Sequence, residues 1–250
     1  MQAYRTLVRR ELSAHFYSWT GYVVMAAVLF LIGLSFSNLL QALNAESTPL
    51  PITELFFDTL YFWFILLLVP PVITMRLLAQ EKSSGTFETL MTTPVSDLQV
   101  VLAKFSGALL FYLLLWVPLI GCIYIVRRYS NDPNVLDAGT LISTYLGIFL
   151  LGSVFVALGL FASALTRSQI IAAMVAFALS FSLLLLSFLA MGSSGQAGWK
   201  AQLYSYLGLV EHMRDFARGV VDTRPVVFYL SVTFFFLFLT HKIVGSRRWR

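Results

Sequence analysis

Six stretches of the sequence contain no Asp, Glu, Lys or Arg, and each is long enough to cross a lipid bilayer as a helix. A hydrocarbon core of roughly 30 Å needs about 17–25 mainly apolar residues in helical form. Backbone groups in lipid must satisfy one another, so we expect an all-α, polytopic membrane protein. The predicted transmembrane helices cover about residues 20–42, 56–76, 104–126, 140–165, 168–191 and 225–244.

The composition excludes an ordinary soluble enzyme. Only 12% of the residues are charged and 58% are hydrophobic, whereas a soluble domain carries roughly a quarter charged residues. The net charge of +5 fits basic loops on one side of a membrane, and no nucleic-acid partner is expected. One cysteine, Cys122, and three widely separated histidines (His15, His212 and His241) give no metal-binding pattern, so no metal ligands are predicted.

The basic residues predict the orientation of the chain. Of the 17 Lys and Arg residues, eleven lie at the termini and in the second and fourth connections, and six lie in the other connections. The positive-inside rule then places both termini in the cytoplasm, as expected for a multi-pass protein of the inner (cytoplasmic) membrane. The apolar stretch after Arg5, Arg9 and Arg10 is too long for a signal peptide, so we expect the N-terminus to be retained.

Residues 3–19 are predicted to form an interfacial elbow helix before the first transmembrane helix. An apolar stripe recurs at helical spacing, and three arginines on the same segment can reach lipid headgroups. The alternative is a basic flank that only directs insertion. The stripe consists of Tyr4, Val8, Leu12, Phe16 and Trp19.

Small residues lie four apart in the fourth and fifth predicted spans. The pairs are Ser153 and Ala157, Gly159 and Ser163, Ala172 and Ala176, and Ala176 and Ser180. Small residues let helix backbones approach closely in lipid. We expect these positions to pack helices within one bundle.

The connection between the second and third spans has the pattern of a short helix between two long ones. Gly85 is an acceptable N-cap, and Thr93 before Pro94 disfavours continuation of the helix. Ser96 and Gln99 predict a capping box at the start of the next helix. The alternative interpretation is an ordinary cytoplasmic loop.

This connection resembles the coupling region of ABC-2 type transporter permeases. The resemblance rests on residues 80–91, which read QEKSSGTFETLM, on Thr93-Pro94-Val95-Ser96, and on Lys104. The family commonly has Gly immediately before that Lys, where this chain has Ala103. Within the family, the sequence is most similar to permeases of gliding-motility and copper-enzyme-maturation systems.

The resemblance implies a single ABC-2 type transmembrane domain over residues 1–250, with a cytoplasmic coupling helix. It implies two copies of a separate ABC ATPase, which would hold ATP and Mg, and a second permease copy or a related permease. The implied function is ATP-driven transport, most simply export. The alternative is a mechanotransmitter that relays ATPase strokes to a periplasmic partner without moving a solute. The implied ATPase-coupling residues are Glu81, Ser84, Gly85, Thr86, Phe87, Glu88, Leu90 and Pro94.

The polar segment from Gly192 to Arg224 contains a second amphipathic piece, predicted to lie outside the cell. Burying its apolar side chains would stabilise the protein by several kcal/mol in total, at about 1.5–3 kcal/mol each. We therefore expect burial at membrane depth or against the outer ends of the fifth and sixth spans, whereas a helix lying on the outer leaflet is the alternative. The resemblance implies a re-entrant helical pair here. The candidate external-gate residues are Leu209, His212, Met213, Phe216 and Val220.

Missing motifs restrict the mechanism. The sequence has no G-x-x-x-x-G-K-[ST] loop, so no nucleotide or other cofactor is predicted in this chain. Few ionisable residues lie within the spans, which disfavours ion-coupled transport. An intramembrane enzyme is a weak third alternative. Ser193 and Ser194 stand between glycines, but His212 is the one nearby base, and no catalytic residue is assigned.

Overall fold

The computed structural model describes residues 2–45, 52–57, 59–86, 96–129, 138–192 and 206–246, and its regular elements in these ranges are helices. Six helical stretches are long and apolar enough to cross a membrane. The prediction of an all-α polytopic protein with six spans is therefore confirmed. The candidate spans are Trp19–Ala42, Leu60–Ser84, Asp97–Arg128, Ala138–Leu165, Gln169–Leu189 and Thr223–Ser246.

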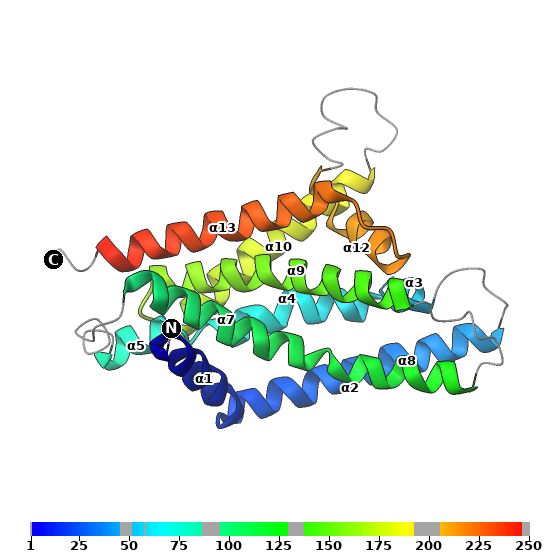
Figure 1. Cartoon of the computed structure of the whole chain (residues 1–250), viewed down its shortest axis with the longest axis horizontal. Coiled ribbons are helices and arrows are strands. Elements are labelled where there is room, and N and C mark those ends of the chain that lie inside the picture. The colour runs from blue at the N-terminus through cyan, green and yellow to red at the C-terminus, as the bar shows by residue number, and fades with distance from the viewer. Residues whose placement is uncertain are drawn as a thin grey trace.

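Figure 1 shows the long helices running side by side, with both termini at one end of the bundle, which we call the terminal end. The opposite end carries the short helices α3 (Ile52–Phe57) and α12 (Leu209–Ala217), and we call it the α12 end. The remaining helices are α1 (Gln2–Phe16), α2 (Trp19–Ala45), α4 (Leu60–Thr74), α5 (Ala79–Ser84), α7 (Asp97–Leu115), α8 (Val117–Tyr129), α9 (Ala138–Leu165), α10 (Gln169–Gly192) and α13 (Thr223–Ser246).

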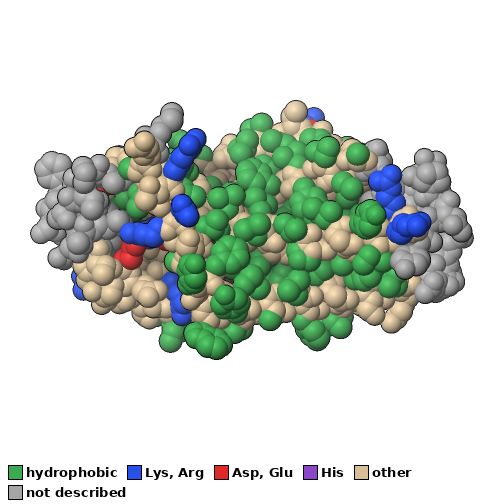
Figure 2. Space-filling model, turned by 60° about the horizontal axis from the view of Figure 1, so that its bottom comes forward, with side chains coloured by type: hydrophobic (Ala, Val, Ile, Leu, Met, Phe, Trp, Pro, Cys, Tyr) green, Lys and Arg blue, Asp and Glu red, His purple; other side chains and the backbone are tan. Residues whose placement is uncertain are grey.

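Hydrophobic side chains cover the middle of the face shown in Figure 2, and Lys and Arg gather toward its two ends. Such a band suits lipid, because large apolar side chains can remain exposed there without contacting water. Phe30, Phe234 and Met174 are each about two-thirds exposed on α2, α13 and α10, at 66%, 72% and 66%.

Helix α9 is the centre of the bundle and the most buried of the six spans. Its glycines let three different neighbours approach closely. A Cβ on Gly147 would lie 3.0 Å from Met213 of α12, one on Gly152 would lie 2.2 Å from the Tyr112 ring of α7, and one on Gly159 would lie 2.0 Å from Thr74 of α4. The small residues of α9 and α10 are buried, as predicted for packing positions within one bundle.

Helix α1 is a separate helix packed on α7, and the predicted elbow boundary at residue 19 is wrong. Helix α1 ends at Phe16, and Trp19 begins α2. A tight corner joins the two helices, because a Cβ on Gly21 would lie 1.9 Å from the carbonyl oxygen of His15. At Gly107 of α7, a Cβ would lie 2.8 Å from the side chain of Glu11, so glycine lets α1 lie directly on α7.

Two span boundaries also differ from the prediction for identifiable reasons. The third span begins at Asp97 instead of residue 104, because Ser96 and Gln99 form the predicted capping box. The second begins at Leu60, because the short helix α3 precedes it as a separate element.

Candidate functional site

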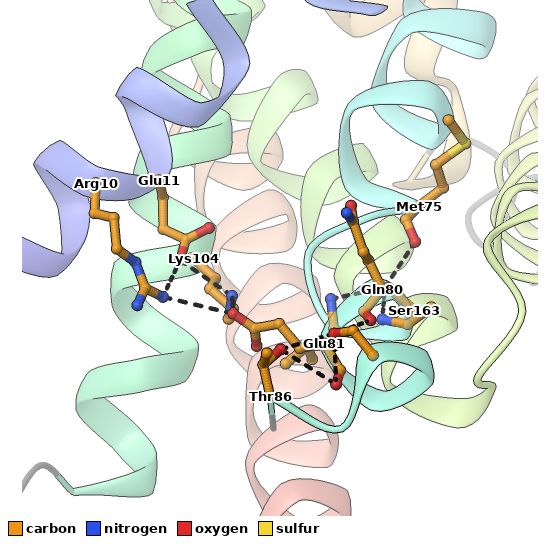
Figure 3. A network of polar contacts seen from close by, with 11 residues as sticks. Arg10, Glu11, Met75, Gln80, Glu81, Thr86, Lys104 and Ser163 are labelled. Atoms are coloured by element: carbon orange, nitrogen blue, oxygen red, sulfur yellow. Dashed lines mark hydrogen bonds and ion pairs between the residues drawn. The ribbon is translucent and has the colours of Figure 1, made fainter. Parts of the chain in front are cut away.

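A buried ion cluster at the terminal end joins three helices (Figure 3). Lys104 of α7 is 2% exposed, and its Nζ lies 3.1 Å from Oε1 of Glu11 in α1 and 2.7 Å from Oε1 of Glu81 in α5. Arg10 donates to the same two carboxylates at 2.8 Å and 3.5 Å. Two cations and two carboxylates thus balance at one point, and they fix α5 against α1 and α7.

The electrostatics of the cluster favour the charged forms of Glu11 and Arg10. Burial alone would raise the pKa of Glu11, but Lys104 and Arg10 outweigh burial and hold that pKa below its ordinary value. The hydrogen bond to Glu11 raises the pKa of Arg10. A buried cation without these carboxylates would be strongly destabilising, so the four side chains depend on one another.

Helix α5 is also bound to the end of α9. The Ser163 hydroxyl of α9 accepts hydrogen bonds from the backbone amides of Leu78 and Ala79 at 3.1 and 3.0 Å. It lies 3.2 Å from the carbonyl oxygen of Met75, to which it donates. Lys82 donates to the Ala164 carbonyl. One hydroxyl thus satisfies backbone groups at the break between α4 and α5, where they would otherwise be buried without partners.

The predicted coupling residues lie at and beyond the end of α5. Glu81 belongs to the ion cluster, and the Ser84 and Thr86 hydroxyls lie 2.8 Å apart on the exposed side. Gly85 has φ +75° and caps the C-terminus of α5; the helix that it is predicted to start continues, after Thr86, outside the described residues. A left-handed conformation suits glycine at a helix C-terminus. The remaining members, Phe87, Glu88, Leu90 and Pro94, lie outside the described residues.

Glu81 is paired within the chain, because its Oε1 lies within ion-pair distance of Lys104 and Arg10. Sequence reasoning missed this arrangement because Glu11, Glu81 and Lys104 are far apart in the chain. The available signal was that all three lie on the predicted cytoplasmic side of the membrane, Glu11 in the elbow helix, Glu81 in the second connection and Lys104 at the start of the third span.

At the α12 end, four of the five predicted gate residues are buried. Met213 is 0% exposed, Phe216 1% and Leu209 2%, and His212 is also buried, with Nδ1 3.0 Å from the Tyr229 hydroxyl of α13. Val220 is 55% exposed, because α12 ends at Ala217 and Gly219 (φ +88°) turns the chain away. Helix α12 packs chiefly on α9, the fourth span, and it also contacts the fifth and sixth, where the Val210 amide donates to Ser187 of α10 and His212 meets Tyr229 of α13.

Polar contacts fix α12 in this buried position. Arg218 donates to both carboxylate oxygens of Glu54 in α3, at 2.8 and 2.6 Å, and Arg214 lies 3.7 Å from the same carboxylate. Thr53 donates to the Ala217 carbonyl and Ser143 to the Phe216 carbonyl, each at 2.6 Å. Protein groups thus satisfy the helix end, as a non-spanning helix at membrane depth requires.

These features define a class: a polytopic helical membrane protein that carries polar anchors at both ends of its bundle and no nucleotide-binding loop. Among the described residues, no three His, Cys, Asp or Glu side chains are grouped so that they could hold a metal ion. The chain belongs to the ABC-2 family transporter proteins, whose sequence profile matches residues 22–244. No curated protein matches the sequence.

Family membership establishes the chain as a membrane permease subunit of an ABC transporter. Such subunits are not themselves catalytic, and an ABC ATPase is the implied partner. The resemblance noted in the coupling region is therefore confirmed at the level of the family.

Proposed function

We propose that this permease belongs to an ATP-driven exporter of the inner membrane, with both termini in the cytoplasm. Two copies, or one copy and a related permease, assemble with two copies of the ATPase. The ATPase docks on the segment that runs from α5 through residues 85–94. Hydrolysis of Mg-bound ATP takes place in the partner.

The three-way attachment of α5 carries this proposal. Glu81 binds α7 through Lys104 and α1 through Arg10, and Ser163 and the Ala164 carbonyl bind the start and middle of α5 to α9. A force on the segment after Gly85 therefore reaches three other helices through short polar contacts. Energetic coupling is carried by packed side chains and polar networks of this kind.

The test reverses one charge in the docking segment. In Glu88→Lys, the permease inserts and folds as wild type, but copurification of the ATPase falls at least tenfold and the permease no longer alters the rate of ATP hydrolysis. Asp132→Lys, in the connection after the third span, is the matched control and keeps both properties. A Glu88→Lys complex with normal assembly and normal ATPase stimulation contradicts docking at this segment.

Proteoliposomes distinguish export from force transmission. An exporter shows ATP-dependent flux of an amphiphile, measured across a library of membrane-lipid and amphiphilic compounds, with hydrolysis stimulated by the transported compound. Hydrolysis that responds only to an added periplasmic protein, without flux, supports the mechanotransmitter and contradicts export.

A further inference from the structure

An open cleft of about 910 Å³ lies at the terminal end between the α1–α2 corner and the end of α4. Its volume is in the range of small-molecule sites. The cleft has two kinds of wall. Its polar wall includes Arg10, His15, Ser18, Thr20 and Arg76, together with Lys104 and the carboxylates Glu11 and Glu81 of the ion cluster. Its apolar wall includes Val24, Val72, Ile73, Leu77 and Phe111.

Arg76 supplies a positive charge that the described side chains do not balance. In the neighbouring ion cluster, Lys104 and Arg10 are matched by Glu11 and Glu81. No carboxylate of the described residues lies within ion-pair distance of Arg76, whose Nη1 donates to Ser18 at 2.7 Å. Its Nε is buried and has no hydrogen-bond partner in the described part of the chain. A guanidinium has five donors, so most of its capacity remains for an anion.

A second unsatisfied nitrogen lies in the same cleft. The His15 Nε2 is buried without a partner among the described residues. The imidazole ring stacks on Phe111, with ring centroids 4.9 Å apart, and this contact fixes its orientation. The hydroxyls of Ser18 and Thr20, 2.6 Å apart, line the same wall. Arginine, imidazole and hydroxyl donors together match the oxygens of a phosphate.

The position of the cleft indicates where the phosphate comes from. Two aromatic side chains at the α1–α2 corner are largely exposed: Tyr17, which lines the cleft, at 88%, and Trp19 at 87%. Tyr and Trp concentrate at the level of lipid headgroups. Val24, Val72 and Ile73 of the apolar wall belong to α2 and α4, two of the candidate membrane spans, so the cleft joins a phosphate-sized polar site to a surface suited to hydrocarbon.

We infer that the cleft binds an anionic phospholipid from the leaflet at the terminal end. The headgroup phosphate accepts hydrogen bonds from Arg76 and His15, and one acyl chain lies along Val24, Val72 and Ile73. The bound lipid supplies the charge that balances Arg76. It also fills the space between α1 and α4 beside the ion cluster.

The test measures lipid retention by the full-length permease in nanodiscs of phosphatidylcholine with 10% phosphatidylglycerol. Lipids that remain after exchange into detergent are quantified by mass spectrometry. The ratio of phosphatidylglycerol to phosphatidylcholine that wild type retains is at least tenfold above the ratio in the nanodisc, and Arg76→Gln reduces this enrichment to less than twofold. Arg167→Gln, which removes an exposed arginine outside the cleft, retains it like wild type.

Further measurements test whether the phosphate belongs to a lipid or to a free anion. They also test whether Arg76→Gln loses the lipid only because the variant misfolds. Ala14→Trp, which fills the cleft from an exposed position, also abolishes enrichment while Arg76 remains. Inorganic phosphate or glycerol 3-phosphate at 10 mM leaves the retained lipid in place, because the acyl chain contributes to binding. Equal enrichment in wild type, Arg76→Gln and Ala14→Trp overturns the inference. Displacement of the lipid by inorganic phosphate also overturns it, since the site is then specific for a free anion.

Discussion

Lys104 is almost removed from water, and its charge is compensated by Glu11 and Glu81 from two other helices. Removing one partner of a buried ion pair leaves an uncompensated charge, which costs about 3–5 kcal/mol in soluble proteins. We predict that Lys104→Met lowers the unfolding temperature of the detergent-solubilised permease by roughly 6–20 °C, on the usual scale for chains of this length. Thermal unfolding followed by intrinsic fluorescence measures the shift.

Two further variants assign that shift to the ion cluster. Lys242→Met removes an exposed lysine at the end of α13 and leaves the unfolding temperature within about 2 °C of wild type. The combination of Lys104→Met with Glu11→Gln and Glu81→Gln recovers most of the loss, because no carboxylate then remains uncompensated. Equal unfolding temperatures for Lys104→Met and wild type would show that the cluster does not hold the three helices together.

At the scale of single helices, α9 depends on glycine where α4 crosses it. A Cβ at position 159 would lie 2.0 Å from Oγ1 of Thr74, and that hydroxyl is held by a 2.7 Å hydrogen bond to the Pro70 carbonyl. We predict that Gly159→Ala destabilises the permease by about 1–3 kcal/mol, as overpacked cores do. The free energy or midpoint of unfolding in mixed micelles measures the effect.

Gly33→Ala is the matched control for this prediction. Gly33 lies within α2, and a Cβ there would meet nothing within 4 Å. The substitution replaces a poor helix former, so it leaves stability unchanged or raises it by about 0.5–1 kcal/mol. A Gly159→Ala variant as stable as Gly33→Ala would show that α4 and α9 can separate at this crossing without cost.

The helices were more predictable than their contacts. Hydrocarbon thickness imposes a minimum length on each span, and charged residues interrupt the apolar stretches, so the six spans follow from local sequence. The capping box at Ser96 and Gln99 is local as well. That Gly85 ends α5 was not predictable, because α5 exists through the break after Thr74, which Ser163 stabilises from a distant part of the chain. Partners such as Glu54 and Arg218 could not be paired from one sequence, because no periodicity relates them.

At the scale of the whole molecule, the two ends of the bundle differ in how they are closed. The terminal end carries the cleft of about 910 Å³ beside the α1–α2 corner. At the α12 end, a void of about 10 Å³ lies among Glu54, Trp63 and Met213, close to the smallest space that holds one water. This difference suits a permease that is closed at the α12 end in the present conformation.

Opening at the α12 end requires α12 to leave its place on α9. Met213 is 0% exposed on the buried face of α12, and Val220 is 55% exposed beyond the end of that helix. A thiol at position 213 therefore reports movement of α12, and one at position 220 reports only access to this end of the bundle. In a Cys122→Ser background with the ATPase bound, we predict that Val220→Cys reacts with a membrane-impermeant thiol reagent at all times. Met213→Cys reacts at least tenfold more slowly at rest and gains reactivity during ATP turnover, because only movement of α12 exposes it. Mass spectrometry of the intact subunit measures both rates. If Met213→Cys labels as readily as Val220→Cys without ATP, α12 does not close this end; if it stays protected throughout turnover, α12 is a fixed structural cap and the gate lies elsewhere.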